Sequence, residues 1–199
     1  MIVLAACAAV AVSLFAFFAV NWHLYSIPSG AMEPTLLVGD NMVAEKGPFA
    51  TDEIGRGEVV VFLNRNDISF VQRVIGIGGD RVQMVGGRVH LNGTALPTAS
   101  AGDFQLEDPG GSTRSVALVE ETLGGRTYGT LDIREGGGGD DTPVFTVPDG
   151  HVFVLGDNRD NSNDSRFQAG FVPVERIVGI ARTIYWSPKR GGAGTYPVR

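Results

Sequence analysis

The stretch Gly156-Asp-Asn-Arg-Asp-Asn-Ser-Asn-Asp-Ser-Arg166 follows directly on the apolar run His151-Val-Phe-Val-Leu155. Asp, Asn and Ser side chains hydrogen-bond to their own backbone, so this composition predicts a tight polar turn at the end of a β-strand. A calcium loop is the alternative, but its frame fails. Counted from Asp157 it places Arg159 at a ligand position, and counted from Asn158 it lacks the glycine. Neither frame supplies a terminal glutamate, and we expect no metal here.

A second segment, Ile27-Pro-Ser-Gly-Ala-Met-Glu-Pro-Thr-Leu-Leu-Val-Gly-Asp40, combines glycine with two prolines. These residues favour a rigid, non-helical backbone. Such a loop can present a side chain and a backbone N–H group at fixed positions. An ordinary linker that leads into a strand is the alternative interpretation, and spacing alone does not separate the two.

A third segment, Phe70-Val-Gln-Arg-Val-Ile-Gly-Ile-Gly-Gly-Asp80, is typical of a strand that ends in a glycine turn. A phosphate-binding P-loop is excluded because no Gly-Lys-Ser/Thr follows the glycines. Alone, this segment carries little functional information.

Short β-branched runs bounded by glycine predict strands over much of the remaining chain. They are Glu58–Leu63, Phe70–Ile75, Asp80–Val85, Arg88–Leu91, His151–Leu155 and Ile177–Trp186. The pair Gly86-Gly87 indicates a hairpin between two of them. No segment beyond the first 22 residues has a helical period over three turns, so the predicted fold class is mainly β.

The segment 97–143 is richer in Gly, Ser, Thr and acidic residues, which suggests an insertion. Within it, Val116–Glu121 and Arg126–Ile133 are predicted strands of a small satellite sheet, and Gly136–Gly139 a mobile loop tip. The predicted organisation is a main β domain over 26–96 and 144–187, an inserted β subdomain over 97–143, and a flexible tail over 188–199.

The N-terminal run MIVLAACAAVAVSLFAFFAV contains one polar residue, Ser13, in twenty. That length suits a bilayer-spanning helix, and Trp22, His23 and Tyr25 behind it suit the membrane interface. A cleavable secretory signal is the alternative, but its apolar part is shorter and follows a basic region. The first basic residue here is Lys46. We therefore expect a single retained anchor over 1–22, next to membrane lipid.

Charge and cysteine content exclude several classes of protein. The net charge is −6 and no basic run occurs, so we expect no nucleic-acid partner. The single cysteine, Cys7, rules out an intrachain disulfide and a cysteine-based zinc site. The three histidines, His23, His90 and His151, lack ligand spacing, and we expect neither a metal nor another cofactor.

Taken together and in this order, the three segments resemble the signature of type I signal peptidases. The runs Ile54–Phe62 and Val147–Asp157 match the same family. The resemblance implies an antiparallel β domain behind one transmembrane helix, anchored in the cell membrane with its soluble domain on the extracytoplasmic side. It also implies a serine endopeptidase that removes signal peptides from exported preproteins with a Ser/Lys dyad.

The dyad positions themselves depart from the family pattern. The nucleophile position precedes the Met-x-Pro-Thr stretch and is Ala31, and the general-base position precedes Arg-Val-Ile-Gly and is Gln72. A methyl group has no lone pair, and a primary amide is not a useful base. The resemblance also assigns supporting positions. They are Ser29 and the Ala31 N–H in the oxyanion hole, Met32 near the substrate groove, and Ser162, Asp157, Arg73, Asp164 and Arg166 in the polar network.

Three functional hypotheses follow. The chain is an inactive signal peptidase, arising by engineering or by natural decay. Alternatively it is a membrane-anchored protein that binds signal-peptide segments by adding them to a strand edge. The third hypothesis is an active enzyme with another nucleophile. Ser29 is then the candidate nucleophile and His151 the candidate base, and both fit poorly.

Overall fold

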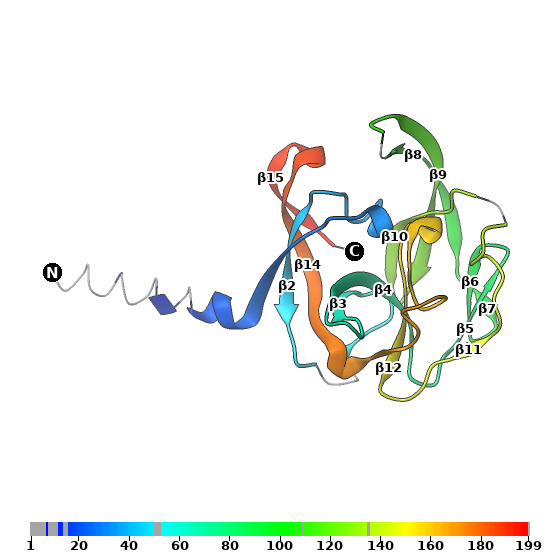
Figure 1. The fold of residues 1–199 in the computed structure, drawn as a ribbon, viewed down its shortest axis with the longest axis horizontal. Helices are drawn as coiled ribbons and strands as arrows, with labels where there is room; N and C mark the ends of the chain where they lie inside the picture. The colour runs from blue at the N-terminus through cyan, green and yellow to red at the C-terminus, as the bar shows by residue number, and fades with distance from the viewer. Residues whose placement is uncertain are drawn as a thin grey trace.

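The structure is a computed structural model that describes residues 7, 12–13, 16–49, 53–108, 110–134 and 136–198. Antiparallel strands arranged in three sheets dominate it (Figure 1). The predicted mainly-β fold class is therefore confirmed. Beyond Asn21 the only helical pieces among the described residues are 3-10 turns, so the expected lack of longer helices also holds for that part of the chain.

The largest sheet has eight strands. Seven follow the order β1-β2-β14-β3-β4-β12-β13, and the eighth, β15, pairs with β14. Their bounds are β1 Trp22–Ser26, β2 Asn41–Lys46, β3 Val59–Leu63, β4 Ser69–Ile77, β12 His151–Leu155, β13 Val172–Pro173, β14 Ile177–Ser187 and β15 Gly192–Pro197. The four strands of this sheet that were predicted from the sequence, β14, β3, β4 and β12, are neighbours at its centre.

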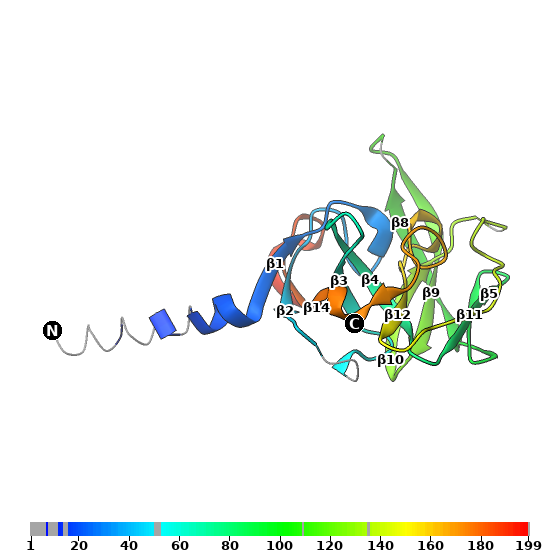
Figure 2. The ribbon, with the colours of Figure 1, turned by 60° about the horizontal axis from the view of Figure 1, so that its bottom comes forward.

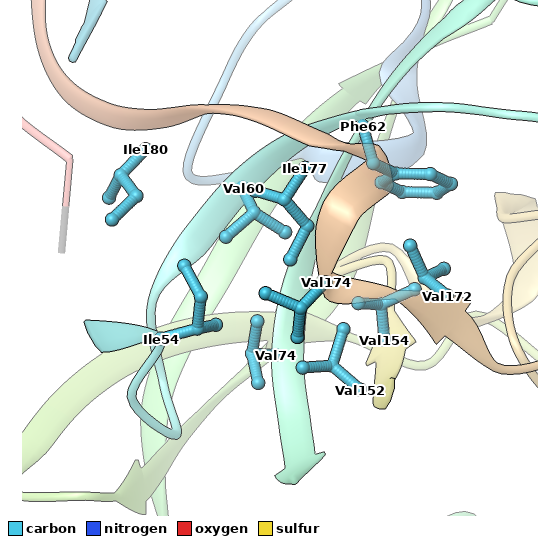
Figure 3. Close-up of a cluster of buried hydrophobic side chains, with 10 residues drawn as sticks. All are labelled: Ile54, Val60, Phe62, Val74, Val152, Val154, Val172, Val174, Ile177 and Ile180. Atoms are coloured by element: carbon cyan, nitrogen blue, oxygen red, sulfur yellow. The ribbon is translucent and has the colours of Figure 1, made fainter. Parts of the chain in front are cut away.

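The core of this sheet is built from β-branched residues, which suit a pleated surface covered on both sides. Val60, Val74 and Val154 from three neighbouring strands meet Ile177 and Ile180 from β14 (Figure 3). All five are at most 3% exposed. Successive residues of a strand point to opposite faces. Buried residues on both faces of β4 therefore hold that strand at a fixed depth.

Two smaller sheets accompany the main one. A four-stranded sheet has the order β11-β5-β6-β7, and a three-stranded sheet the order β10-β9-β8. Their bounds are β5 Arg81–Val85, β6 Arg88–Leu91, β7 Thr94–Ala95, β8 Thr98–Glu107, β9 Thr113–Leu123, β10 Arg126–Leu131 and β11 Phe145–Thr146. The three-stranded sheet, called the inserted sheet below, lies wholly within 97–143. It contains the two satellite strands predicted there and a third, β8, that was not predicted.

Four 3-10 turns with bounds inside the described part of the chain connect these strands. They are η1 Gly30–Met32, η3 Arg159–Asn161, η4 Val174–Arg176 and η5 Pro188–Arg190. Two of them, η1 and η3, fall inside the two loops that the sequence singles out. Both loops are otherwise non-helical, as expected.

The predicted anchor lies largely outside the described residues. Residues 16–21 are helical and project from the domain, leading into β1 (Figures 1 and 2). No helix within the described part of the chain is long and apolar enough to cross a bilayer. Trp22, His23 and Tyr25, expected at the membrane interface, belong to β1, which pairs with β2.

One expectation was wrong: the tail 188–199 is not flexible over its described part. Residues 192–197 form β15, whose partners in β14 include Thr183 and Ile184. The Tyr196 hydroxyl also donates to the Arg190 carbonyl at 2.9 Å. Glycine-rich composition concealed this strand, because its stability comes from pairing with β14 and not from its own β propensity.

Candidate active site

The segment Ile27–Asp40 is closed by its own backbone. The Ile27 N–H donates to the Asp40 carbonyl at 2.8 Å, and the Gly39 N–H donates to the Ile27 carbonyl at 2.8 Å. The Asp40 carboxylate accepts from the Leu37 N–H at 2.9 Å. These bonds make a compact loop that carries η1, with Ala31 at its centre. The predicted rigidity of this loop has a structural basis.

Ala31 lies directly against the polar loop Gly156–Arg166. Its carbonyl accepts from the Asn158 N–H at 3.1 Å, and the neighbouring Gly30 carbonyl accepts from Asn158 Nδ2 at 3.1 Å. A Cβ added to Gly156 would lie 2.6 Å from the Ala31 carbonyl and 2.3 Å from Ser162 Oγ. Only glycine fits at 156, because the two loops meet there. Ala31 and Ser162 thereby approach the same point.

Gln72 lies on β4, and its side chain reaches the same place from the sheet. Its Nε2 donates to Ser162 Oγ at 3.2 Å and to the Asn163 carbonyl at 3.0 Å. The residue is 2% exposed, and its Oε1 finds no hydrogen-bond partner among the described residues. The surroundings of Gln72 thus supply acceptors for an N–H group and leave a buried carbonyl oxygen unsatisfied, which is an unfavourable arrangement for an amide.

Arg73, the next residue on β4, points to the other face of the sheet and pairs with Asp157. Its Nε and Nη2 donate to the two carboxylate oxygens of Asp157 at 2.8 and 2.7 Å. Nη1 donates to the Gly57 carbonyl at 2.7 Å, and the guanidinium stacks 3.8 Å from the Tyr128 ring centre. Thr35 Oγ1 donates to Asp157 at 2.5 Å. This bidentate pair is fully buried and ties β4 to the polar loop, while the Thr35 hydrogen bond ties Ile27–Asp40 to the same carboxylate.

A second pair fixes the end of the polar loop. Arg166 donates from Nε and Nη2 to the two oxygens of Asp164, both at 2.9 Å. Asp164 also accepts from the Gly156 N–H at 3.2 Å, and Arg166 Nη2 donates to the Arg159 carbonyl at 2.5 Å. Asp164 and Arg166 therefore close the loop on itself and hold Gly156 in place.

A third pair was not anticipated from the sequence. Arg159 donates to the two carboxylate oxygens of Glu121 on β9 at 2.7 and 2.5 Å. Burial opposes the charge of Arg159, but the Glu121 carboxylate outweighs it and raises the pKa of the guanidinium. Burial, and then the Glu121 charge, raises the pKa of Tyr128, whose hydroxyl donates to Glu121 at 3.2 Å. The inserted sheet is thus locked to the polar loop.

The remaining predicted site residues lie apart from this network. Ser29 is exposed at the start of η1, with no cap bond from its side chain. Met32, expected near the substrate groove, is instead 2% exposed and packs with Ile27 and Leu36 in the core, because the 3-10 turn directs it inward. His151 is half-buried, and its Nδ1 lies 3.0 Å from the Asp149 carbonyl.

Three carboxylates gather near the end of the inserted sheet, at Asp132, Asp140 and Asp160. Asp160 accepts from the backbone N–H groups of Ile133 and Arg134, and Asp140 from that of Gly137. Burial, followed by the charges of Asp140 and Asp160, raises the pKa of Asp132 to about 6. Two of the three carboxylates, Asp140 and Asp160, therefore accept hydrogen bonds from backbone N–H groups.

Comparison with known proteins places this chain in a family. A family model described as signal peptidase, peptidase S26, matches residues 1–186. Signal peptidase I of Rickettsia typhi is 32% identical over 193 residues, covering 83% of this chain and 72% of the relative. Signal peptidase I of Rickettsia canadensis is 33% identical over 194 residues, with the same coverage.

A crystal structure of a signal peptidase I from Enterococcus faecalis is 26% identical and covers 68% of this chain and 97% of its own. Its TM-score is 0.38, which is too low for this likeness to bear on the fold. The family match spans nearly the whole chain, and the Rickettsia relatives exceed 30% identity. The chain belongs to the signal peptidase family, peptidase S26.

Proposed function

We propose that this chain is a membrane-anchored signal peptidase that retains the architecture of its site but lacks the two groups that perform the reaction. The single observation that carries this proposal is the environment of Gln72. Acceptors at Ser162 Oγ and Asn163 O face its amide nitrogen, and its Oε1 is buried without a described partner. A lysine amine, which donates and does not need to accept, suits these surroundings better than an amide does.

Position 31 is the second missing group. A serine there would stand on the loop that meets Ser162 at Gly156, close to the Gln72 side of the polar loop. With alanine there is no oxygen to attack a carbonyl and no proton for a base to remove. The loss of such a nucleophile costs on the order of 10⁶ in rate in comparable serine hydrolases.

Binding of the substrate does not depend on the hydroxyl missing at position 31 or on the amine missing at position 72. The Ala31 N–H and the Ser29 hydroxyl are the proposed oxyanion donors, and Ser29 is exposed at the entrance of the loop. The supporting pairs Arg73–Asp157 and Asp164–Arg166 hold the scaffold. We infer that the chain binds signal-peptide segments of exported preproteins without cleaving them. The alternative function is that of a non-catalytic membrane-anchored protein whose biological purpose is this binding.

The proposed placement follows the apolar run at 1–22. One helix anchors the chain in the cell membrane, and the β domain, 26–96 and 144–187, with its insertion 97–143, works on the extracytoplasmic side. The exposed Phe17, Val20 and Leu24, at 65, 71 and 50%, support contact with lipid at the end of this helix. No nucleic acid, metal or other cofactor enters the proposal.

The experiment uses the detergent-solubilised chain with a preprotein whose signal ends in Ala-x-Ala. We expect no cleavage, and saturable binding of a fluorescent peptide that comprises the signal segment alone. The Ser29→Ala and His151→Ala variants serve as controls for a substitute nucleophile or base. Cleavage by the unaltered chain that disappears in either variant would establish an active enzyme with a different dyad and overturn the proposal.

A further inference from the structure

The C-terminal segment, residues 187–198, lies beyond the part of the chain that the family model matches, which ends at residue 186. It turns through η5 and returns as β15, which pairs with β14 (Figure 1). At this turn Pro188 lies against Gly39, because a Cβ added to that glycine would be 2.9 Å from Pro188 Cγ. The segment therefore reaches the end of the loop Ile27–Asp40, which carries position 31.

Arg190 makes the main polar contacts between this segment and the loop. Its Nη2 donates to the Pro34 carbonyl at 3.3 Å and to the Thr35 carbonyl at 3.1 Å. Its Nε lies 3.7 Å from Oδ2 of the fully buried Asp40 and so places a positive charge beside that carboxylate. A buried carboxylate is stabilised by a neighbouring cation. Arg190 thus contacts the loop at its middle and at its end.

The Arg190 side chain is itself held in place by the C-terminal segment. The Tyr196 hydroxyl donates to the Arg190 carbonyl at 2.9 Å, and the guanidinium lies 5.7 Å from the centre of the Tyr196 ring. A guanidinium is attracted by the face of an aromatic ring. Tyr196 belongs to β15, so the pairing of β15 with β14 fixes the position from which Arg190 reaches the loop.

The loop is held by two different parts of the chain. The Thr35 hydroxyl donates to Asp157 in the polar loop at 2.5 Å, whereas the Thr35 carbonyl accepts from Arg190. Four residues earlier, the Ala31 carbonyl accepts from the Asn158 N–H at 3.1 Å. The stretch around position 31 therefore has one attachment in the polar loop and a second in the C-terminal segment. The orientation of a side chain at position 31 depends on both.

We propose that Arg190 is a positioning residue, which fixes the loop that carries position 31 and so the direction in which a nucleophile at that position would point. The inference rests on the proposed function, which makes position 31 the place of the missing nucleophile. Arg190 acts through the loop and not on the substrate. Loss of its guanidinium should therefore loosen the segment 27–40 and slow the chemical step without weakening substrate binding.

The first measurement is hydrogen exchange, followed by NMR on the otherwise unaltered chain, and it needs no catalysis. The N–H groups of Ile27 and Gly39 each donate at 2.8 Å to a carbonyl within the loop. In Arg190→Met we expect these two amides to exchange about tenfold faster, a larger acceleration than at the Val74 N–H in β4. A general loss of stability would instead accelerate Val74 at least as much as the loop.

Arg176→Met is the matched control. Arg176 also donates to two backbone carbonyls, those of Leu63 and Asn64, and also pairs with an aspartate. The side chains of Arg176 and Arg190 are 34% and 28% exposed, but Arg176 holds the turn between β3 and β4. Arg176→Met should therefore leave the exchange of the 27–40 amides unchanged.

The second measurement is cleavage in the Ala31→Ser/Gln72→Lys background. There Arg190→Met should lower kcat about tenfold and change KM by less than about twofold, whereas Arg176→Met should change neither. Arg190→Lys keeps a cation beside Asp40 and should recover part of the loss in kcat. It replaces Arg190→Met in both measurements if that variant does not fold.

The inference is overturned if the loop amides accelerate no more than Val74. It is also overturned if kcat is unaffected by Arg190→Met, or falls equally in Arg176→Met. If the Ala31→Ser/Gln72→Lys background does not cleave but the expected exchange result is obtained, the proposed function fails and the role of Arg190 in holding the loop stands.

Discussion

The arginine–carboxylate pairs around the polar loop and the amide of Gln72 lie within the same buried site, yet their hydrogen bonding differs. Arg73, Arg159 and Arg166 each meet both oxygens of a carboxylate. Gln72 satisfies its nitrogen and leaves Oε1 without a described partner. Asp40 Oδ1 and Asn158 Oδ1, in the two loops, also lack a described partner, so the ion pairs are satisfied whereas single oxygens of neighbouring side chains are not. The proposal that a lysine suits position 72 better than an amide rests on this difference.

The largest effect is expected from breaking the scaffold. Arg73→Met removes the cation from Asp157, which is 1% exposed, and should lower the free energy of unfolding by about 3–5 kcal/mol. Urea denaturation measures the loss. The control Arg114→Met breaks an ion pair whose side chains are 48 and 42% exposed and should cost no more than about 1 kcal/mol. Equal losses in the two variants would contradict a scaffold held by buried pairs.

The junction of the two loops gives the next effect. Gly156→Ala places a methyl group 2.3 Å from Ser162 Oγ and 2.6 Å from the Ala31 carbonyl, so the loops must separate. We expect a loss of about 1–3 kcal/mol in unfolding free energy and weaker binding of the signal segment. At Gly138 an added Cβ meets nothing within 4 Å, so Gly138→Ala is the matched control. A Gly156→Ala variant as stable as this control would show that the loops do not meet as described.

Replacing Gln72 by lysine has a smaller, pH-dependent effect on the free energy of unfolding. In a Gln72→Lys variant, burial disfavours the ammonium and lowers the pKa of the lysine in the folded state. The unfolded chain then binds more protons than the folded one, so stability rises with pH, by about 1–3 kcal/mol between pH 7 and 10. Denaturation at several pH values, with Gln83→Lys on the half-buried β5 as the reference, measures it. A stability that does not change more with pH than in the reference would mean that position 72 is solvated.

The smallest effect concerns Asp132, whose neighbour Asp160 belongs to the polar loop. Its pKa is raised to about 6 by burial and by the nearby Asp140 and Asp160. Because the folded state holds this proton more tightly, its contribution to stability is complete near pH 4 and is lost as pH rises through about 6. NMR titration of the Asp132 carboxyl should give a midpoint near 6, and Asp160→Asn should lower it. A midpoint at the ordinary value near 3.8 would contradict the close grouping of these carboxylates.

Several strands of the fold could be predicted because they carry local signals. Arg88–Leu91 and His151–Leu155 have the predicted bounds, and glycine marks their ends. The strands β2 and β8 were missed, since Asn41–Lys46 and Thr98–Glu107 contain few β-branched residues. Those two segments become strands through their antiparallel neighbours, β14 and β9, and pairing between distant segments leaves little trace in local composition.

The site shows the same division. The resemblance led to Gln72 and Ser162, and the structure brings them into hydrogen-bond contact. The Arg159–Glu121 pair was not predicted, because Glu121 lies 38 residues earlier, in the insertion, and has no sequence link to the polar loop. Met32 was placed on a groove by its position in the family pattern, but the turn of η1 buries it. Contacts set by turn geometry and by the docking of a second sheet required the structure.

The most direct measurement is the cleavage rate of a preprotein by the unaltered chain, by Ala31→Ser, by Gln72→Lys and by the double reversion. A nucleophile and its base act as a unit, so neither single change should restore activity. We predict that the double variant Ala31→Ser/Gln72→Lys cleaves at least about 10³-fold faster than either single variant. A double reversion that folds and binds the signal segment but remains as inactive as the unaltered chain would contradict the claim that the scaffold of the site is intact.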